Sequence, residues 1–216
     1  MDKIAQNIAK IKKTIESLEK RPIKVQLIAI TKNFSQDPII SAINLGINNF
    51  GENRIQECET KFLTIKKKYP KIILHMVGPL QTNKVKKALT LFDVIHTLDR
   101  EKLANYISAH ITPQSKTKDF FIQVNIGDEK QKSGIEISKA TDFIKWSIND
   151  LKINVIGLMC IPPLEESPRK YFSKLKKIAE ENNLRNLSMG MTSDYEEAIK
   201  CGSTHIRIGT GIFGTR

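Results

Sequence analysis

The sequence predicts a single α/β barrel of the (β/α)8, TIM type, preceded by an extra N-terminal helix. Short apolar runs typical of buried strands alternate with longer amphipathic segments typical of helices throughout the 216 residues. Eight strand-like runs occur, a number that favours a closed barrel over an open sheet. No low-complexity linker or break in composition divides the chain, so we expect one domain spanning residues 1–216.

The first 20 residues form the predicted extra helix. Isoleucines and one leucine recur at alternating steps of four and three, which aligns them on one helical face: Ile4, Ile8, Ile11, Ile15 and Leu18. This segment lacks the continuous apolar core of a secretory signal, and no run in the chain is long enough to span a bilayer. We therefore expect a cytoplasmic protein that does not insert into membranes.

The predicted strands share apolar, often β-branched residues bounded by polar or glycine-rich turns. They cover residues 25–31, 48–51, 72–77, 94–97, 120–126, 154–160, 186–189 and 204–208. The helices predicted between them cover residues 38–45, 54–68, 83–89, 101–110, 139–148, 167–181 and 195–200.

Polar and glycine-rich segments gather where the predicted strands end. They are Lys32 after the first strand, FGEN at the second, HMVGPLQTNK at the third, QVNIGDEKQKSG at the fifth, GLMCIPP at the sixth, SMGMTSD at the seventh and HIRIGTGIFG at the eighth. In a barrel of this type the carboxyl ends of the strands share one face, and the loops that follow them carry the chemistry. The pattern predicts a single functional site on that face.

Lys32 follows the first strand directly. Period-two alternation places its side chain on the same strand face as Ile28 and Ile30. Partial desolvation at the barrel mouth would favour the neutral amine, which attacks carbonyl groups in Schiff-base chemistry. The alternative is a solvated lysine at the barrel rim.

The ends of the last two strands predict a phosphate site. Gly209, Thr210 and Gly211 follow the eighth strand, where glycine lets backbone N–H groups approach a phosphate. Thr192 and Ser193 follow the seventh strand, and barrels often hold phosphate at this pair of loops. A tight turn and an ordinary helix cap are the structural alternatives.

Arg207 lies within the eighth strand, where a buried arginine is costly unless it is paired. It could form an internal ion pair with a carboxylate such as Glu52, or donate to a ring nitrogen of a bound cofactor. Because arginine has only donors, that nitrogen would have to be an unprotonated acceptor. A pyridine ring held in this way is a weaker electron sink.

Five further polar or soft side chains are candidates near the strand ends. Asn53 could reach the lysine or a cofactor hydroxyl, or cap a helix. We expect Gln123 in an internal polar layer, and Asn125 either there or in the site. His75 is expected to be a hydrogen-bonded core residue, whereas Met76 could pack against a flat ring.

Cysteine spacing and charge exclude other classes. Cys58, Cys160 and Cys201 form no CxxC pair, so we expect reduced thiols and no metal site. The net charge of +12 comes from lysines scattered along the chain, without a basic arm and with few aromatic residues for stacking on bases. We therefore expect no nucleic-acid partner.

Several motifs together resemble one protein family. They are LIAITK, FGENRIQE, HMVGPLQTNKVK, IHTLD, FIQVNIGDEKQKSGI, GLMCIP, LSMGMTSDYEEAI and GSTHIRIGTGIFG, which cover nearly the whole chain. The chain resembles the pyridoxal-phosphate homeostasis proteins, the YggS-like family, whose barrel is similar to the N-terminal domain of alanine racemase.

The resemblance implies a pyridoxal 5′-phosphate (PLP) site. It implies that Lys32 holds PLP as a Schiff base and that Arg207 faces the pyridine nitrogen. The remaining implied binding residues are Thr192, Gly209 and Thr210 at the phosphate, with Asn53 and Met191 lining the pocket. Thr192 stands where serine is usual in the family and keeps the hydroxyl, whereas Met76 stands where an aromatic residue is common.

The resemblance also implies a function in intracellular PLP homeostasis, by buffering or delivery that affects amino-acid and keto-acid balance, with transient contact to PLP-dependent apoenzymes. Racemases and decarboxylases of this fold carry a second, β-rich domain, and we expect none after the barrel here. No strand-end tyrosine is an obvious second base, since Tyr195 is expected on a helix surface. We therefore expect a monomer without strong activity and assign no catalytic residue.

Two alternatives remain open from the sequence. A slow PLP-dependent amino-acid racemase would use the same lysine and cofactor. A lysine aldolase acting on a sugar phosphate fits the barrel but does not explain Arg207.

Overall fold

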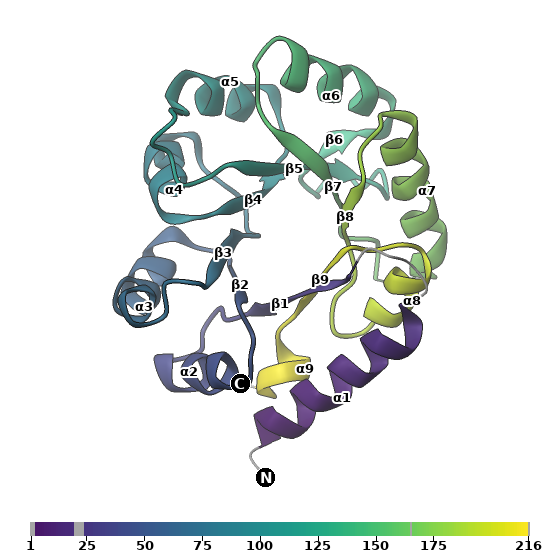
Figure 1. Ribbon diagram of the computed structural model, residues 1–216. Helices are drawn as coiled ribbons and strands as arrows, with labels where there is room; N and C mark the ends of the chain where they lie inside the picture. The colour runs from purple at the N-terminus through teal and green to yellow at the C-terminus, as the bar shows by residue number, and fades with distance from the viewer. Residues whose placement is uncertain (1–2, 20–23, 165, 216) are drawn as a thin grey trace.

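Eight parallel strands follow one another around a closed ring in the computed structural model, which describes residues 3–19, 24–164 and 166–215 (Figure 1). The ring order is β1-β2-β3-β4-β5-β7-β8-β9, and β9 pairs with β1 to close it. The strands are β1 (Gln26–Ile30), β2 (Asn49–Glu52), β3 (Ile73–Met76), β4 (Val94–Leu98), β5 (Asp119–Asn125), β7 (Val155–Met159), β8 (Asn186–Ser188) and β9 (His205–Ile208). The predicted (β/α)8 barrel is confirmed.

Helices surround the ring (Figure 1). They are α2 (Gln36–Asn44), α3 (Ile55–Lys68), α4 (Val85–Leu91), α5 (Glu101–His110), α6 (Ala140–Asn149), α7 (Pro168–Glu181), α8 (Tyr195–Lys200) and α9 (Thr210–Phe213). Within the described ranges, none of the helices combines the length and the hydropathy that a bilayer crossing requires.

The predicted N-terminal helix is present as α1 (Lys3–Leu18), while residues 1, 2 and 20 of the prediction lie outside the described residues. Ile8, Ile11 and Ile15 are buried, as their spacing indicates. The helix packs against α9, α8 and α2, and the Asn7 side-chain amide donates to the carbonyl oxygen of Ile212 at 2.9 Å. This helix therefore supports the segment that follows β9.

Four short elements escape the sequence prediction. Strand β6 (Ile135–Glu136) pairs with β5 alone, outside the ring. Two 3-10 turns, η1 (Thr82–Lys84) and η2 (Ile137–Lys139), lead into α4 and α6. Helix α9 follows the eighth strand, at glycines for which a tight turn was the structural alternative. Each is four residues or fewer, too short for hydrophobic periodicity to reveal.

The barrel interior contains a layer of buried polar side chains. His96 in β4 contacts Ser188 in β8, and Phe121 in β5 contacts His205 in β9. Neither pair of strands is adjacent in the ring, so both contacts cross the interior. Arg207 joins this layer from β9, where it is paired in register with Ile28 of β1.

A second buried polar group lies between β2 and α3. Glu52 ends β2 with 1% of its surface exposed, and its Oε1 accepts from Thr31 Oγ1 at 2.6 Å and from Lys61 Nζ at 2.9 Å. Lys61 also donates to the carbonyl oxygen of Thr31 at 2.6 Å. Burial raises the pKa of Glu52, and the hydrogen bonds from Thr31 and Lys61 oppose that rise. This group fixes the peptide that precedes Lys32.

These contacts overturn one interpretation of Arg207. An ion pair between Arg207 and Glu52 does not form, because Glu52 is bonded to Thr31 and Lys61. The two charged groups occupy different layers, one inside the ring and one against α3.

Replacing Lys61 by methionine should destabilise the fold by about 3 kcal/mol at pH 7, because it leaves the Glu52 carboxylate buried without a cation. Urea unfolding measures the loss. The same change at exposed, unpaired Lys67 on the same helix is the matched control and should cost little. Adding Glu52→Gln to Lys61→Met should recover part of the loss. Equal losses for the Lys61 and Lys67 variants would contradict this account.

Candidate functional site

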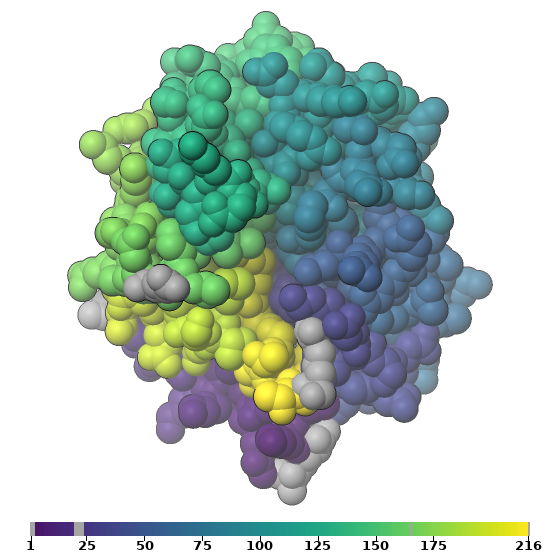
Figure 2. All heavy atoms as spheres, turned by 180° about the vertical axis from the view of Figure 1, so that it is seen from behind, coloured from purple at the N-terminus to yellow at the C-terminus, as the bar shows by residue number. Residues whose placement is uncertain are grey.

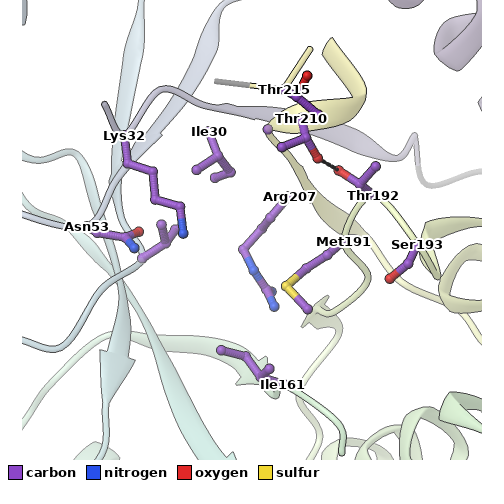
Figure 3. A pocket seen from close by; sticks show the side chains of 12 residues that line it. Ile30, Lys32, Asn53, Ile161, Met191, Thr192, Ser193, Arg207, Thr210 and Thr215 are labelled. Atoms are coloured by element: carbon purple, nitrogen blue, oxygen red, sulfur yellow. Dashed lines mark hydrogen bonds between the residues drawn. The ribbon is translucent and has the colours of Figure 1, made fainter. Parts of the chain in front are cut away.

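A cavity of about 650 Å³ opens at the carboxyl ends of the strands (Figure 3). Its lining residues are Ile30, Lys32, Asn53, Val77, Ile161, Met191, Thr192, Ser193, Arg207, Gly209, Thr210 and Thr215. Every binding residue that the family resemblance implied is among them. Residues separated by up to 185 positions, from Ile30 to Thr215, are thus brought to one cavity by barrel closure.

Lys32 is half-buried at the start of the loop after β1. The next residue, Asn33, has a φ of 63°, so the chain turns sharply once it has placed the lysine. The Lys32 side chain extends into the cavity (Figure 3). No described residue accepts a hydrogen bond from its nitrogen or forms an ion pair with it. The structure therefore presents a nitrogen free to react with a ligand.

Arg207 forms part of the wall across from Lys32 (Figure 3). Its side chain is held on two nitrogens, since Nη1 donates to Ser188 Oγ at 2.7 Å and Nη2 donates to the carbonyl oxygen of Cys160 at 3.0 Å. No carboxylate of the described residues pairs with it, and burial lowers its pKa. Because a guanidinium carries five N–H groups, donors remain for a ligand in the cavity.

Hydroxyl groups gather at the third side of the cavity. Thr210 Oγ1 donates to Thr192 Oγ1 at 3.3 Å, and the Gly211 N–H donates to the same oxygen at 3.3 Å. A Cβ on Gly211 would lie 2.8 Å from Ile208 Cγ2 and 3.1 Å from Thr192 Cγ2, so only glycine permits this approach of the two loops. The loops after β8 and β9 are thereby joined.

The C-terminal segment is also tied to the loop after β1. The rings of Phe34 and Phe213 lie 4.9 Å apart between centroids, and a Cβ on Gly209 would lie 3.3 Å from the carbonyl oxygen of Ile30. The space-filling view from behind shows the yellow C-terminal atoms beside blue-violet atoms of the early chain (Figure 2). The hydroxyl groups and Lys32 are thus held in one rigid setting.

The donor set fits one kind of ligand. An amine can react with a carbonyl group, and the hydroxyl cluster can donate hydrogen bonds to a phosphate. An arginine that has no carboxylate partner can donate to a neutral acceptor such as an unprotonated ring nitrogen. Asn53 lines the wall beside Lys32, and Met191 lines it beside Arg207 (Figure 3). A phosphorylated aldehyde that carries a nitrogen heterocycle combines all three features.

Some nominated side chains lie elsewhere. His75 is buried in the barrel interior and bonded to His96 and Asn49, as expected of a core residue. Met76 lines a neighbouring cavity that shares only Asn53 with the main one, so the suggestion that it packs against a ring in the main site is wrong. Asn53 does not cap α3, because the residue preceding that helix is Arg54.

Other polar candidates serve local structure. Gln123 Nε2 donates to the carbonyl oxygen of Ser133, and Asn125 Nδ2 donates to that of Glu129, so both hold the loop after β5. The Asp194 carboxylate accepts from the Met191 N–H rather than from α8. Tyr195 begins α8, where it is half-buried and packs partly against the hydrophobic core. It does not line the cavity.

The sequence reasoning missed part of the lining. Ile161 belongs to the loop that follows β7, and its position after a strand end, in GLMCIPP, was the available signal. Thr215 follows α9, which the sequence did not reveal. Among the described residues, no three His, Cys, Asp or Glu side chains are placed to share a metal ion, and the cysteines are buried free thiols. Burial raises the pKa of Cys160 to about 12.

The chain is similar to known proteins along nearly its whole length. Residues 1–216 match the family described as alanine racemase, N-terminal domain. The pyridoxal phosphate homeostasis protein of Pasteurella multocida is 37% identical over 99% of this chain and 97% of its own, and that of Aquifex aeolicus is 34% identical over 100% and 97%.

One solved structure is similar in fold and in sequence over nearly the whole chain. The structure of PipY from Synechococcus elongatus without PLP has a TM-score of 0.88 and 30% identity over 98% of this chain and all of that one. PipY with PLP bound gives a TM-score of 0.84 over the same share of each chain. With a matching fold, a matching family and relatives of this identity along its whole length, the chain belongs to the pyridoxal phosphate homeostasis proteins, within the family of the alanine racemase N-terminal domain.

Proposed function

We propose that this protein binds PLP in the 650 Å³ cavity and acts in intracellular PLP homeostasis, buffering or delivering the cofactor and so affecting amino-acid and keto-acid balance. The observation that carries the proposal is the presence, in one cavity, of an unpaired lysine, a carboxylate-free arginine and a cluster of hydroxyl groups. The function named for the relatives and the PLP bound to PipY support it.

Each side chain has a distinct role in this proposal. Lys32 would hold PLP covalently, because its amine can form an imine with the aldehyde by loss of water. Thr192, Thr210 and the backbone at Gly209 hold the phosphate, and Arg207 donates to the pyridine nitrogen. Asn53 and Met191, which also line the cavity, orient the ring. Bound PLP supplies an aldehyde for attachment and a ring able to accept electrons.

The cavity wall supports a carrier without strong catalytic activity. Among its described lining residues, Lys32 is the sole side chain able to exchange protons readily, because no carboxylate, imidazole, thiol or phenol lines it. Racemisation needs proton exchange on both faces of the substrate carbon. Donation from Arg207 keeps the ring nitrogen unprotonated, which weakens the electron sink.

The setting of the protein is part of the same proposal. Residues 1–216 form one PLP-binding domain that acts as a monomer in the cytoplasm, where buried free thiols remain reduced. PLP-dependent apoenzymes are its transient partners.

Purified protein incubated with PLP should be yellow, and Lys32→Ala should lose the visible absorbance of the lysine imine. Borohydride reduction followed by peptide mass analysis should place the cofactor on Lys32. Lys71→Ala, which removes an exposed lysine, is the matched control and should retain the colour. A colourless parent protein, or covalent attachment at another lysine, would contradict the assignment.

Thr192→Val should weaken PLP binding about tenfold, because it deletes one hydroxyl contact to a charged phosphate. Binding of pyridoxal, which lacks the phosphate, should be unchanged by the same variant. Thr90→Val on α4 controls for the substitution itself. Equal losses for PLP and pyridoxal would place the Thr192 effect away from the phosphate.

Loaded protein should not racemise amino acids at enzyme-like rates, which begin at about 1 s⁻¹. Formation of the opposite enantiomer, followed by chiral chromatography for several amino acids, measures this directly, and Lys32→Ala provides the background. Stereospecific turnover at or above that rate would favour the slow-racemase alternative and overturn the carrier proposal.

A further inference from the structure

Behind Arg207, a line of hydrogen-bonded side chains crosses the barrel interior. Ser188 Oγ lies 2.7 Å from Arg207 Nη1 and 2.8 Å from His96 Nδ1. His96 Nε2 lies 2.9 Å from His75 Nδ1, and His75 Nε2 lies 3.0 Å from Asn49 Oδ1. The line passes from β9 to β8, across the ring to β4, then to β3 and β2 (Figure 1).

The guanidinium sets the direction of every bond in this line. Because arginine only donates, Ser188 Oγ accepts from it, and the Ser188 hydroxyl hydrogen is free for His96 Nδ1. A neutral His96 that accepts at Nδ1 must donate from Nε2. His75 then accepts at Nδ1 and donates from Nε2 to the Asn49 side-chain oxygen.

The opposite direction leaves a buried group unsatisfied. If His96 donated from Nδ1, Ser188 Oγ would accept two hydrogen bonds, and its own hydrogen would have no acceptor among the described residues. Ser188 has no exposed surface, so leaving its hydroxyl hydrogen without an acceptor would cost about 1–3 kcal/mol of folding free energy. Every hydrogen bond in the line is therefore donated in the direction away from Arg207.

The surroundings keep both imidazoles neutral. His75 and His96 are almost completely buried, and His96 stacks on Phe121 with ring centroids 4.4 Å apart. Burial lowers the pKa of His75 to about 3 and that of His96 well below its usual range, and the charges of His205 and Arg207 act in the same direction on His96. No carboxylate contacts either ring in the described structure.

We propose that Ser188, His96 and His75 are positioning residues that lock the Arg207 guanidinium as a donor facing the cofactor ring. This deepens the proposed function, on which it rests. Ser188 holds one terminal nitrogen and the Cys160 carbonyl oxygen holds the other, so the plane of the guanidinium is fixed. The neutral chain places only acceptors behind the guanidinium, so its remaining N–H groups meet an acceptor only in the cavity.

The first test needs no cofactor. Nitrogen-15 NMR of the ligand-free protein should show His75 and His96 as neutral Nε2–H tautomers from pH 7 down to about pH 5, in accord with their lowered pKa. Ser188→Ala removes one buried oxygen and should shift both histidines toward mixed tautomers. An imidazolium at pH 7, or an Nδ1–H tautomer at His96, would overturn the proposal.

The second test connects the chain to the ring nitrogen. Ser188→Ala should weaken PLP binding roughly tenfold, as expected for loss of a hydrogen bond to a charged group. The loss should vanish for a PLP analogue with carbon in place of the ring nitrogen. His205→Gln is the matched control, because His205 lies in the barrel interior but outside the line of hydrogen-bonded side chains. Equal losses for PLP and the analogue would overturn the proposal, whereas failure of the parent protein to bind PLP would refute the proposed function and leave the NMR result standing.

Discussion

A guanidinium group buried inside the barrel is the constraint on which the rest of the site depends. Arg207 is 5% exposed and has no carboxylate partner among the described residues, so neutral acceptors must satisfy it. Ser188 and the Cys160 carbonyl oxygen provide two. The group retains donors toward the cavity. A ligand with a neutral acceptor is the natural complement to this arrangement.

The carboxylate that might have paired with this arginine is used elsewhere. Glu52 is held by Thr31 and Lys61 between the sheet and α3, and the same group fixes the peptide before Lys32. Because Glu52 pairs with Lys61, Arg207 and Lys32 have no carboxylate partner among the described residues. Arg207 keeps donors for a ligand, and Lys32 stays unpaired and available for covalent attachment. The structure thus keeps negative side chains out of a cavity suited to an anionic cofactor.

The cavity is built to hold a ligand from several sides. The amine comes from the end of β1, the arginine from β9 and the hydroxyl groups from the loops after β8 and β9. Close approach at Gly211 and contact between Phe34 and Phe213 join these loops. Rigid placement of donors favours binding, whereas catalysis by proton transfer needs a second exchangeable group, which the described lining lacks.

The sequence by itself determined the barrel and nominated residues that line its cavity. Strand periodicity and the polar strand ends are local signals, and they sufficed for the eight ring strands and for nominating Lys32 and Arg207. Short elements such as β6 and α9 carry too few residues for a periodic signal, so they emerged only in the fold. Tertiary structure alone decided which partners meet across the ring, because closure joins strands distant in sequence. It paired Glu52 with Lys61, moved Met76 to a neighbouring cavity and aligned His75 and His96 behind Arg207.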